Sequence, residues 1–438
     1  MKKFENNIGV LVPKVMLPDE KADFYSWAVV ACDQFTSQPE YWDEARRIIG
    51  DNPSTLDLFL PEAFLGTDDE SERIRKIREN MSRYLEEGIL KEREQGFVLV
   101  KRSVAGNTRN GLILALDLEE YDYHKGSETL IRATEGTIES RIPPRLRIRE
   151  GAPIELPHIL VLIDDPALSV IEPLVDEEDT LPLLYDTDLM LDGGHISGRL
   201  VCDEKKVMQV LDALKKLMDP DAFKKKYGDH KPLLFAMGDG NHSFATAKAN
   251  WEKVKANLKP AEMENHPARY ALVEIENVHD RGIVFEPIHR VVFGVEGTKA
   301  ISILKKHLEE QNGSVEIRDE VLNACGGQFH VIPFFTKDKC GSFVVKSPSQ
   351  QLAVGTLQNA IDKLLKEVDG SEVDYIHGDS VVRELASKEE SIGFLLPAMA
   401  KSELFPTVVY DGALPRKTFS MGEANEKRYY LECRYIGK

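Results

Sequence analysis

The sequence predicts an α/β protein with mixed sheets, in an α+β or irregular α/β arrangement, and three observations lead to this class. Short apolar runs such as residues 159–163 and 233–237 end at turn-forming residues, as buried strands do. Residues 71–87 instead place apolar side chains three and four positions apart, which is the spacing of an amphipathic helix. Strands and helices of this kind follow one another without a strict strand–helix–strand rhythm, which favours mixed sheets.

The first part of the chain is expected to contain mainly strands. They are expected at residues 8–17, 27–32, 97–103, 111–118 and 159–164, with a hairpin turn at Gly106-Asn107. A short helix is expected to begin near Pro39, with Ser37 as its cap. The basic residues 141–149 are expected to form a solvated or ion-paired strand, with a basic binding patch as the alternative.

The second part of the chain is expected to alternate irregularly between helices and strands. Helices are expected at residues 207–218, 243–258, 298–311 and 360–368. Strands are expected at residues 233–237, 270–275, 283–285, 374–377, 391–395 and 429–435, with a hairpin over residues 329–346. Because 438 residues suffice for two or three domains, we expect an N-terminal α/β region (1–150), a central region with the main motif (151–297) and a C-terminal α/β region (298–438).

Composition narrows the class of protein. The net charge of −18 repels the phosphates of nucleic acid, so nucleic acid is an unexpected partner. The longest apolar runs are too short to span a bilayer and no secretory signal is seen, so no membrane association is expected and the cytoplasm is the expected location. None of the five cysteines forms a C-x-x-C pair, which argues against a disulfide framework or a cysteine zinc site.

Residues 233–247 contain the most informative pattern, in which an apolar strand, a glycine turn and a helix follow one another. The turn reads Gly238-Asp239-Gly240-Asn241-His242-Ser243. Turn glycines let a ligand approach the backbone closely, and the N–H groups at a helix start favour an anion. The sequence therefore predicts an anion-binding site, with Gly238, Gly240, Asn241 and Ser243 as binding residues.

Two residues of this turn are candidate catalytic groups. Asp239 is a candidate general base, or a contact for a magnesium ion that accompanies a nucleotide. His242 is a candidate phosphate donor or proton shuttle. The alternative is that Asp239 and Asn241 only shape the turn and Ser243 only caps the helix.

Two polar segments further along the chain are candidate ligand contacts. His289 and Arg290 end a predicted strand, where they would grip a phosphate or form a structural pair. Lys417 and Thr418 lie in a loop before the last predicted strand and are candidate phosphate contacts. The glycine-rich residues 192–199 lack the Lys and Ser/Thr of a nucleotide-binding P-loop, so a hairpin turn is expected there.

The turn from Gly238 to Ala247 resembles the A-D-G-H-H-R-Y-x-T-A signature of the domain of unknown function 1015 family. Three further stretches agree in order along nearly the whole chain, namely residues 131–134, 286–290 and 414–418. The D-G-H-H-R core is similar to that of the ParB/sulfiredoxin-like superfamily, which includes free serine kinases. The resemblance implies a ParB/sulfiredoxin-like core with large flanking elaborations.

This resemblance implies a turn that contacts nucleotide phosphates while a nearby carboxylate activates a small substrate. The chain departs from the motif at Asn241, which stands for a histidine, and at Ser243, which stands for an arginine. A serine hydroxyl cannot supply the missing charge, so Arg290, Lys248 or Lys417 would have to do so.

The expected function is therefore a small-molecule phosphotransferase, with an amino acid such as serine as acceptor. ATP or ADP would be the nucleotide and Mg²⁺ the metal, with Asp239 as its contact. The alternative is a non-enzymatic regulatory protein that binds a nucleotide or metabolite. In both cases the partner is a small anionic molecule, and a homo-oligomer is possible.

Overall fold

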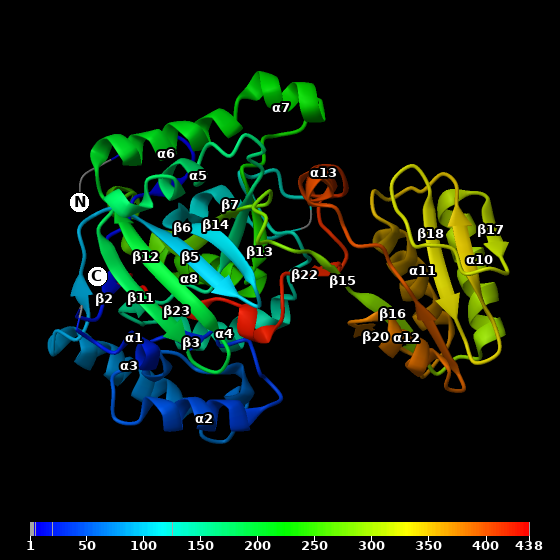
Figure 1. Cartoon of the computed structure of the whole chain (residues 1–438), viewed down its shortest axis with the longest axis horizontal. Coiled ribbons are helices and arrows are strands. Elements are labelled where there is room, and N and C mark those ends of the chain that lie inside the picture. The colour runs from blue at the N-terminus through cyan, green and yellow to red at the C-terminus, as the bar shows by residue number, and fades with distance from the viewer. Residues whose placement is uncertain (1–3, 5, 20, 125, 438) are drawn as a thin grey trace. The chain divides into compact units, whose positions relative to one another are not determined.

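The computed structural model describes residues 4, 6–19, 21–124 and 126–437. Contacts divide the chain into two compact units, one made of Met1–Val284 with Gly422–Lys438 and the other of Phe285–Met421 (Figure 1). They are called unit 1 and unit 2 below. The three sequence regions expected above divide the chain at other positions, and that division remains a prediction.

Unit 1 is built on a ten-stranded sheet. The order across the sheet is β11 (Leu183–Leu189), β12 (Gly194–Val201), β5 (Phe97–Val104), β6 (Asn107–Asp117), β14 (Tyr270–Asn277), β10 (Leu160–Ile163), β13 (Phe235–Asp239), β8 (Ile131–Arg132) and β7 (Tyr121–Asp122), and β1 (Val10–Leu11) also pairs with β6. Strand β10 is parallel to β14 and antiparallel to β13. The mixed α/β class predicted from the sequence is confirmed.

Side chains that alternate along the strands give the sheet two apolar faces. In β5, Leu99 belongs to one hydrophobic cluster and Val98 to another, as the two-residue repeat of a strand requires. The first cluster takes in α6 (Glu204–Leu217) and α8 (Asn241–Lys255), and the second takes in α2 (Pro39–Ile49) and α3 (Glu70–Glu86). Helices therefore cover both faces of the sheet (Figure 1).

Shorter elements connect and border this sheet. They are β2 (Met16–Leu17), α1 (Phe24–Trp27), β3 (Val29–Val30), η1 (Thr55–Asp57), η2 (Glu62–Phe64), β4 (Lys91–Glu92), η3 (Leu118–Glu120), η4 (Glu139–Arg141), α4 (Ile142–Arg149), β9 (Ile154–Glu155), α5 (Glu172–Val175), η5 (Glu178–Thr180), α7 (Pro220–Tyr227), α9 (Pro260–Met263), η6 (Pro267–Arg269), η7 (Ala424–Glu426), β23 (Tyr429–Tyr430) and β24 (Arg434–Tyr435). After unit 2 the chain returns to unit 1, where β23 pairs with β3. This return places C-terminal residues against the N-terminal part of the chain.

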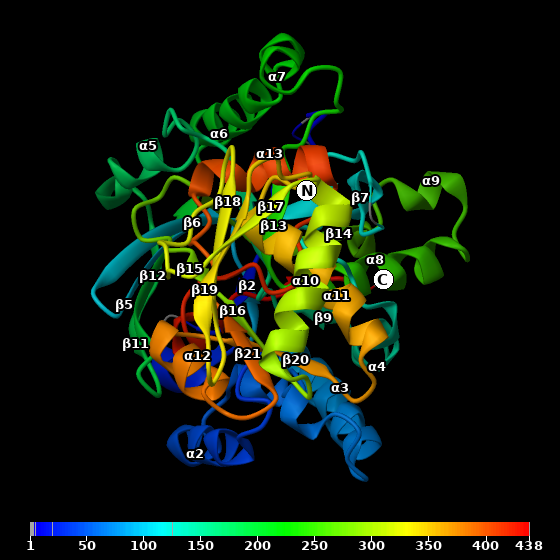
Figure 2. The same ribbon diagram turned by 90° about the vertical axis from the view of Figure 1, so that its right-hand side faces the viewer.

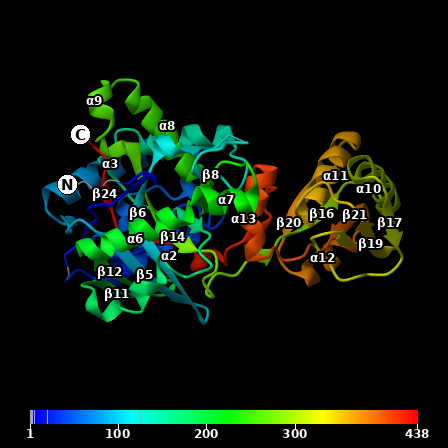
Figure 3. The ribbon, with the colours of Figure 1, turned by 90° about the horizontal axis from the view of Figure 1, so that it is seen from above.

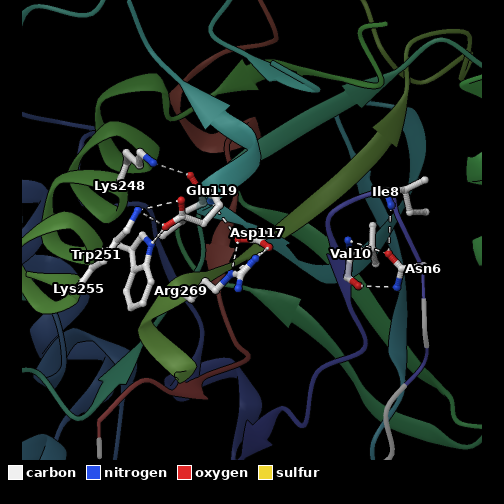
Figure 4. Close-up of polar contacts among 10 residues, drawn as sticks. Asn6, Ile8, Val10, Asp117, Glu119, Lys248, Trp251, Lys255 and Arg269 are labelled. Carbon is white, nitrogen blue, oxygen red and sulfur yellow. Dashed lines mark hydrogen bonds and ion pairs between the residues drawn. The ribbon is translucent and has the colours of Figure 1, made fainter. Parts of the chain in front are cut away.

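Helix α8, which begins in the predicted motif, is held in place from its far end (Figure 4). The Glu119 carboxylate accepts hydrogen bonds from the Trp251 indole at 2.5 Å and from Lys255 at 2.7 Å. Lys248 donates to the Leu118 carbonyl at 2.9 Å. These contacts orient the helix while its first turn remains at the motif.

Unit 2 contains a six-stranded antiparallel sheet. Its order is β17 (Val315–Arg318), β19 (Cys340–Val345), β18 (His330–Phe335), β21 (Ser391–Phe394), β16 (His289–Phe293) and β20 (Glu372–Ile376), seen nearly edge-on in Figure 2. Helices α10 (Gly297–Asn312) and α11 (Ala353–Glu367) lie on one face and α12 (Asp379–Ala386) lies on the other, as Figure 3 shows. The unit also contains α13 (Lys401–Asp411) and a small pair of strands, β15 (Glu286–Pro287) and β22 (Phe419–Ser420).

The local predictions meet the structure with mixed success. The hairpin turn at Gly106-Asn107 is confirmed by the pairing of β5 with β6. The strand expected at residues 141–149 is wrong, because that segment forms helix α4, with prolines in the first turn where their missing N–H groups cost nothing. Pro39 begins α2 as expected, but the cap residue is Gln38 rather than Ser37.

Candidate functional site

The strand–turn–helix predicted for the motif is confirmed in unit 1. Strand β13 ends at Asp239, Gly240 takes the left-handed conformation with φ of 80°, and α8 begins at Asn241. A Cβ at position 240 would lie 3.2 Å from the Ile159 backbone, so glycine is needed for both conformation and space. Gly240, the N-cap residue of α8, has no side chain with which to cap the helix. The turn therefore combines a close backbone approach with an uncapped helix start.

Asp239 is a half-buried carboxylate with two donors. Its Oδ1 accepts a hydrogen bond from the Gly240 amide at 2.8 Å, and its Oδ2 lies 3.1 Å from Nζ of Lys427. Burial alone would raise the pKa of Asp239, but the ammonium of Lys427 outweighs burial and holds that pKa below its usual range. The side chain is thus a charged carboxylate at neutral pH, which suits a cation contact better than proton abstraction.

The next two motif residues present hydrogen-bond acceptors in the same turn. Nε2 of His242 accepts from the Ile138 amide at 3.3 Å. The Asn241 Oδ1 atom is buried and has no hydrogen-bond partner among the described residues. Such an acceptor is costly unless something donates to it, so it marks a position for a donor from a ligand or water. Gly238 lies within β13.

Ser243 begins a chain of hydrogen bonds that runs into the interior. Its Oγ lies 2.8 Å from Nε2 of His158, and Nδ1 of His158 lies 2.8 Å from the hydroxyl of Tyr430. The Cys32 amide donates to the Tyr430 hydroxyl at 3.3 Å. His158 reaches Ser243 because it lies just before β10, whose Leu160 pairs with Asp239. The position where the family motif has arginine thus holds a serine joined to an imidazole.

A cavity of about 130 Å³ lies against Ser243. Most of its wall is apolar, and His158, Tyr430 and Cys32 contribute polar atoms. Two ion pairs complete the wall: Arg145 lies 2.5 Å from Glu62, and Arg149 pairs with Glu155. Burial raises the pKa of Glu62 despite the adjacent guanidinium. The cavity and the motif thus meet at Ser243.

The other predicted contacts lie in unit 2. His289 is buried, with Nδ1 accepting from the Leu396 amide at 3.1 Å and Nε2 lying 2.9 Å from Asp379. Burial lowers the pKa of His289. Thr418 is also buried and donates to the Pro415 carbonyl at 2.6 Å.

Arg290 is fully buried and its guanidinium is surrounded by protein acceptors. It donates to the carbonyls of Lys417 at 2.9 Å and Arg416 at 2.8 Å, and to the carbonyl of Ile288. Its Nε donates to Gln358 at 3.1 Å. This side chain ties the loop before β22 to strand β16. The structure thus brings Gly238–Ser243 together in unit 1 and His289, Arg290, Lys417 and Thr418 together in unit 2.

Three residues of the unit 1 site escaped the sequence analysis: His158, Lys427 and Tyr430. Only His158 could have been suspected from the sequence, because it directly precedes an apolar strand and so lies in a loop at the end of that strand, where functional residues are common. Lys248, one of the cations considered there, donates to Leu118 and pairs with Glu252 at 2.8 Å. Lys427 is the cation that contacts the motif carboxylate.

Solved structures with a related fold are distant. Free serine kinase in complex with AMP is similar over 74% of this chain and 91% of its own, with 11% identity and a TM-score of 0.35. SbnI from Staphylococcus aureus with a C-terminal truncation is similar over 74% of this chain and 82% of its own, with 11% identity and a TM-score of 0.33. A conserved hypothetical protein from Pyrococcus furiosus covers 73% of this chain and 90% of its own, with 12% identity and a TM-score of 0.33.

At these values the similarity assigns no function. No curated protein matches the sequence. No helix among the described residues is long and apolar enough to cross a membrane. The family profile of DUF1015, described as a protein of unknown function, matches residues 13–385, and the chain belongs to this family.

Proposed function

We propose that the chain is a nucleotide-dependent phosphotransferase that acts on a small molecule, with an amino acid such as serine as one acceptor. The observation that carries this proposal is the Asp239–Lys427 pair at 3.1 Å beside the uncapped start of α8. A helix start favours the charge of a phosphate, and the Lys427 ammonium adds a positive charge beside it. The half-buried turn supplies acceptors for the non-phosphate part of the ligand.

In this proposal each group of the turn has one task. The amides at the start of α8 and Lys427 bind phosphate oxygens of ATP or ADP. Asp239 contacts the Mg²⁺ that accompanies the nucleotide, because a low-pKa carboxylate is a hard oxygen ligand. No group of three acidic, histidine or cysteine side chains that would hold a metal alone occurs among the described residues. This fits Mg²⁺ because the ion takes most of its remaining ligands from phosphates and water.

A second candidate function is a nucleotide or metabolite sensor without turnover. The serine at position 243 favours it, because an arginine that would stabilise charge in phosphoryl transfer is missing there. Both functions place an anionic ligand at the same turn. They differ in whether a product forms.

Two measurements separate the candidates. Calorimetric titrations with ATP, ADP, CTP and GTP in the presence of Mg²⁺ should show binding of at least one nucleotide. Phosphorus NMR of the same mixture with L-serine should show a phosphomonoester if the chain is a phosphotransferase. Nucleotide binding without product from any acceptor supports the sensor, and no binding of any nucleotide contradicts the phosphotransferase.

A further inference from the structure

The cavity beside Ser243 has an apolar body. Its wall includes Phe59, Leu65, Met81, Leu156 and Ile159. Its volume of about 130 Å³ is close to that of an engineered apolar cavity of about 150 Å³ that binds benzene. The space therefore fits an apolar group of about six carbon atoms.

The charged groups in the cavity wall are already paired. Glu62 is paired with Arg145, and Glu155 accepts from both Arg149 and Arg434. An ionic head group in this space would have to compete with these pairs, whereas a neutral apolar group only has to leave water. The cavity thus favours an uncharged occupant.

The polar end of the cavity is organised around the serine hydroxyl. Ser243 lines the cavity and is also the third residue of α8, so it borders both the cavity and the helix start. His158 is 9% exposed and Tyr430 is 2% exposed, and both also line the cavity. Of the three linked residues, Ser243 is the one that belongs to the first turn of α8, so a hydroxyl bonded to Ser243 lies at the helix start.

From this arrangement we infer that the cavity is the acceptor subsite and that it takes a neutral alcohol whose apolar body is about as large as a benzene ring. The inference rests on the proposed phosphotransferase function, and it assigns that function a neutral apolar alcohol as acceptor in place of an amino acid such as serine. The acceptor hydroxyl donates to Ser243, and Ser243 donates to Nε2 of His158. His158 acts through Ser243 and is a positioning and proton-accepting residue.

The transfer step balances without a further reactant. The acceptor oxygen forms a bond to the γ-phosphorus of a nucleoside triphosphate, and the bond from that phosphorus to the bridging oxygen breaks, which releases the nucleoside diphosphate. The acceptor proton moves to Oγ of Ser243 while the Ser243 proton moves to Nε2 of His158. The resulting imidazolium lies near two carboxylates, Asp239 and Glu62, which interact favourably with its charge.

The relay requires the His158 tautomer with its proton on Nδ1. The Tyr430 oxygen lies 2.8 Å from Nδ1 of His158 and can accept a hydrogen bond from its N–H group. The same oxygen accepts a hydrogen bond from the Cys32 amide at 3.3 Å. The Tyr430 hydroxyl proton can then point to the Cys32 thiol, with which this hydroxyl also forms a hydrogen bond. Burial raises the pKa of the Cys32 thiol, so the thiol remains neutral beside the relay.

The first test compares three alcohols as acceptors with ATP and Mg²⁺ in the full chain. Benzyl alcohol should give a kcat/KM about 50-fold above that of ethanol, since burial of its ring removes apolar surface from water. L-serine should lie near ethanol. A preference for L-serine over benzyl alcohol overturns the acceptor class and leaves the phosphotransferase function standing.

The second test fills the cavity. Ala152→Phe places a ring in the cavity wall. It should abolish binding of benzyl alcohol, measured by ligand-observed NMR, and should retain nucleotide binding. Ala222→Phe on the exposed face of α7 is the matched control and should change neither. Equal benzyl alcohol binding by both variants overturns the subsite, as does binding to the unchanged chain without phosphorylation in the presence of bound nucleotide.

The third test addresses the relay. Ser243→Ala and His158→Gln should each lower kcat while leaving the KM for the alcohol nearly unchanged, and Ser243→Thr, which keeps the hydroxyl, should preserve kcat. If kcat is the same in all three variants, the relay is wrong. If the unchanged chain does not bind a nucleotide, that result contradicts the proposed function itself.

Discussion

The turn at Gly238–Ser243 and the loop at residues 415–418 both present polar side chains next to a strand, yet their environments differ. In unit 1, Asp239 is half-buried and keeps a partly exposed carboxylate beside Lys427. In unit 2, the loop carbonyls of Arg416 and Lys417 accept hydrogen bonds from Arg290, which is fully buried and also donates to Gln358. The first arrangement leaves polar groups for a ligand, whereas the second uses them to stabilise a loop.

This difference teaches how to separate binding residues from structural ones. A residue type alone does not distinguish them, because arginine and histidine serve both purposes. The number of protein acceptors around a buried donor does distinguish binding residues from structural ones, since a donor that already has partners gains little from a ligand. On this criterion the contacts of His289 and Arg290 are structural in this conformation, and their assignment as ligand contacts remains a prediction.

The largest expected effect is on turnover in unit 1. Asp239→Asn keeps the shape of the side chain but removes the charge, so kcat of the proposed transfer should fall by about 10²–10⁴-fold. Because the side chain is partly exposed, the free energy of unfolding should change by only about 1 kcal/mol. Asp229→Asn, at an exposed aspartate paired with Lys224, is the control for kinetics. Equal turnover in both variants would remove Asp239 from the site.

The next effect is on stability in unit 2. Arg290→Met leaves several buried carbonyls without a donor, so the free energy of unfolding of unit 2 should fall by about 4 kcal/mol. The three tryptophans at positions 27, 42 and 251 all lie in unit 1, so tryptophan fluorescence reports unit 1 alone. Hydrogen exchange should show earlier opening of β16, and the exposed Arg318→Met should leave it unchanged. A variant with full stability and weaker nucleotide binding would reverse the assignment of Arg290.

The two units should respond in opposite ways to acid. Burial lowers the pKa of His330 to about 4 from its ordinary 6.5, so the folded state of unit 2 binds fewer protons than the unfolded state between these values. This group's stabilisation is present above pH 6.5 and is lost as pH falls to about 4, a change of about 3 kcal/mol.

In unit 1, burial raises the pKa of Glu276 to about 7 from 4.5, although Arg109 opposes this shift. This group's contribution is greatest below pH 4.5 and falls as pH rises to about 7. Urea titrations at pH 4.5, 5.5 and 7, read by fluorescence for unit 1 and by hydrogen exchange for unit 2, check both signs. His330→Gln and Glu276→Gln should each flatten the response of their own unit, and a shared response in both units would contradict the assignment.

A smaller effect is expected at the turn glycine. Gly240→Ala combines a left-handed backbone with a contact to Ile159 and should cost about 2 kcal/mol, with weaker nucleotide binding. Gly88→Ala has the same backbone sign but open space, so it should cost only about 1 kcal/mol. Thermal unfolding of both variants measures the difference, and equal losses would show that the contact to Ile159 is unimportant.

The sequence predicted those features that depend on neighbouring residues. The strand, the glycine and the helix at 235–255 follow from local periodicity and turn chemistry, and so does the hairpin of β5 and β6. Helix α4 was missed because its two prolines disfavour a helix interior but are tolerated in a first turn.

The polar partners of the motif could not be predicted because tertiary folding brings them together. Ser243 and His158 are 85 residues apart, and Tyr430 is 272 residues from His158. Lys427 reaches Asp239 only because the chain returns to unit 1 after unit 2. No local pattern indicates which of the 56 basic residues will meet the motif.

The most direct test of the site is an ATP titration of the unchanged chain and of Lys427→Met at low ionic strength. If the start of α8 binds phosphate with the help of Lys427, the dissociation constant should rise about tenfold in the variant and the difference should shrink as salt is added. Lys388→Met in unit 2, at an exposed lysine, should bind as the unchanged chain does. Identical dissociation constants for all three proteins, at every salt concentration, would contradict the account.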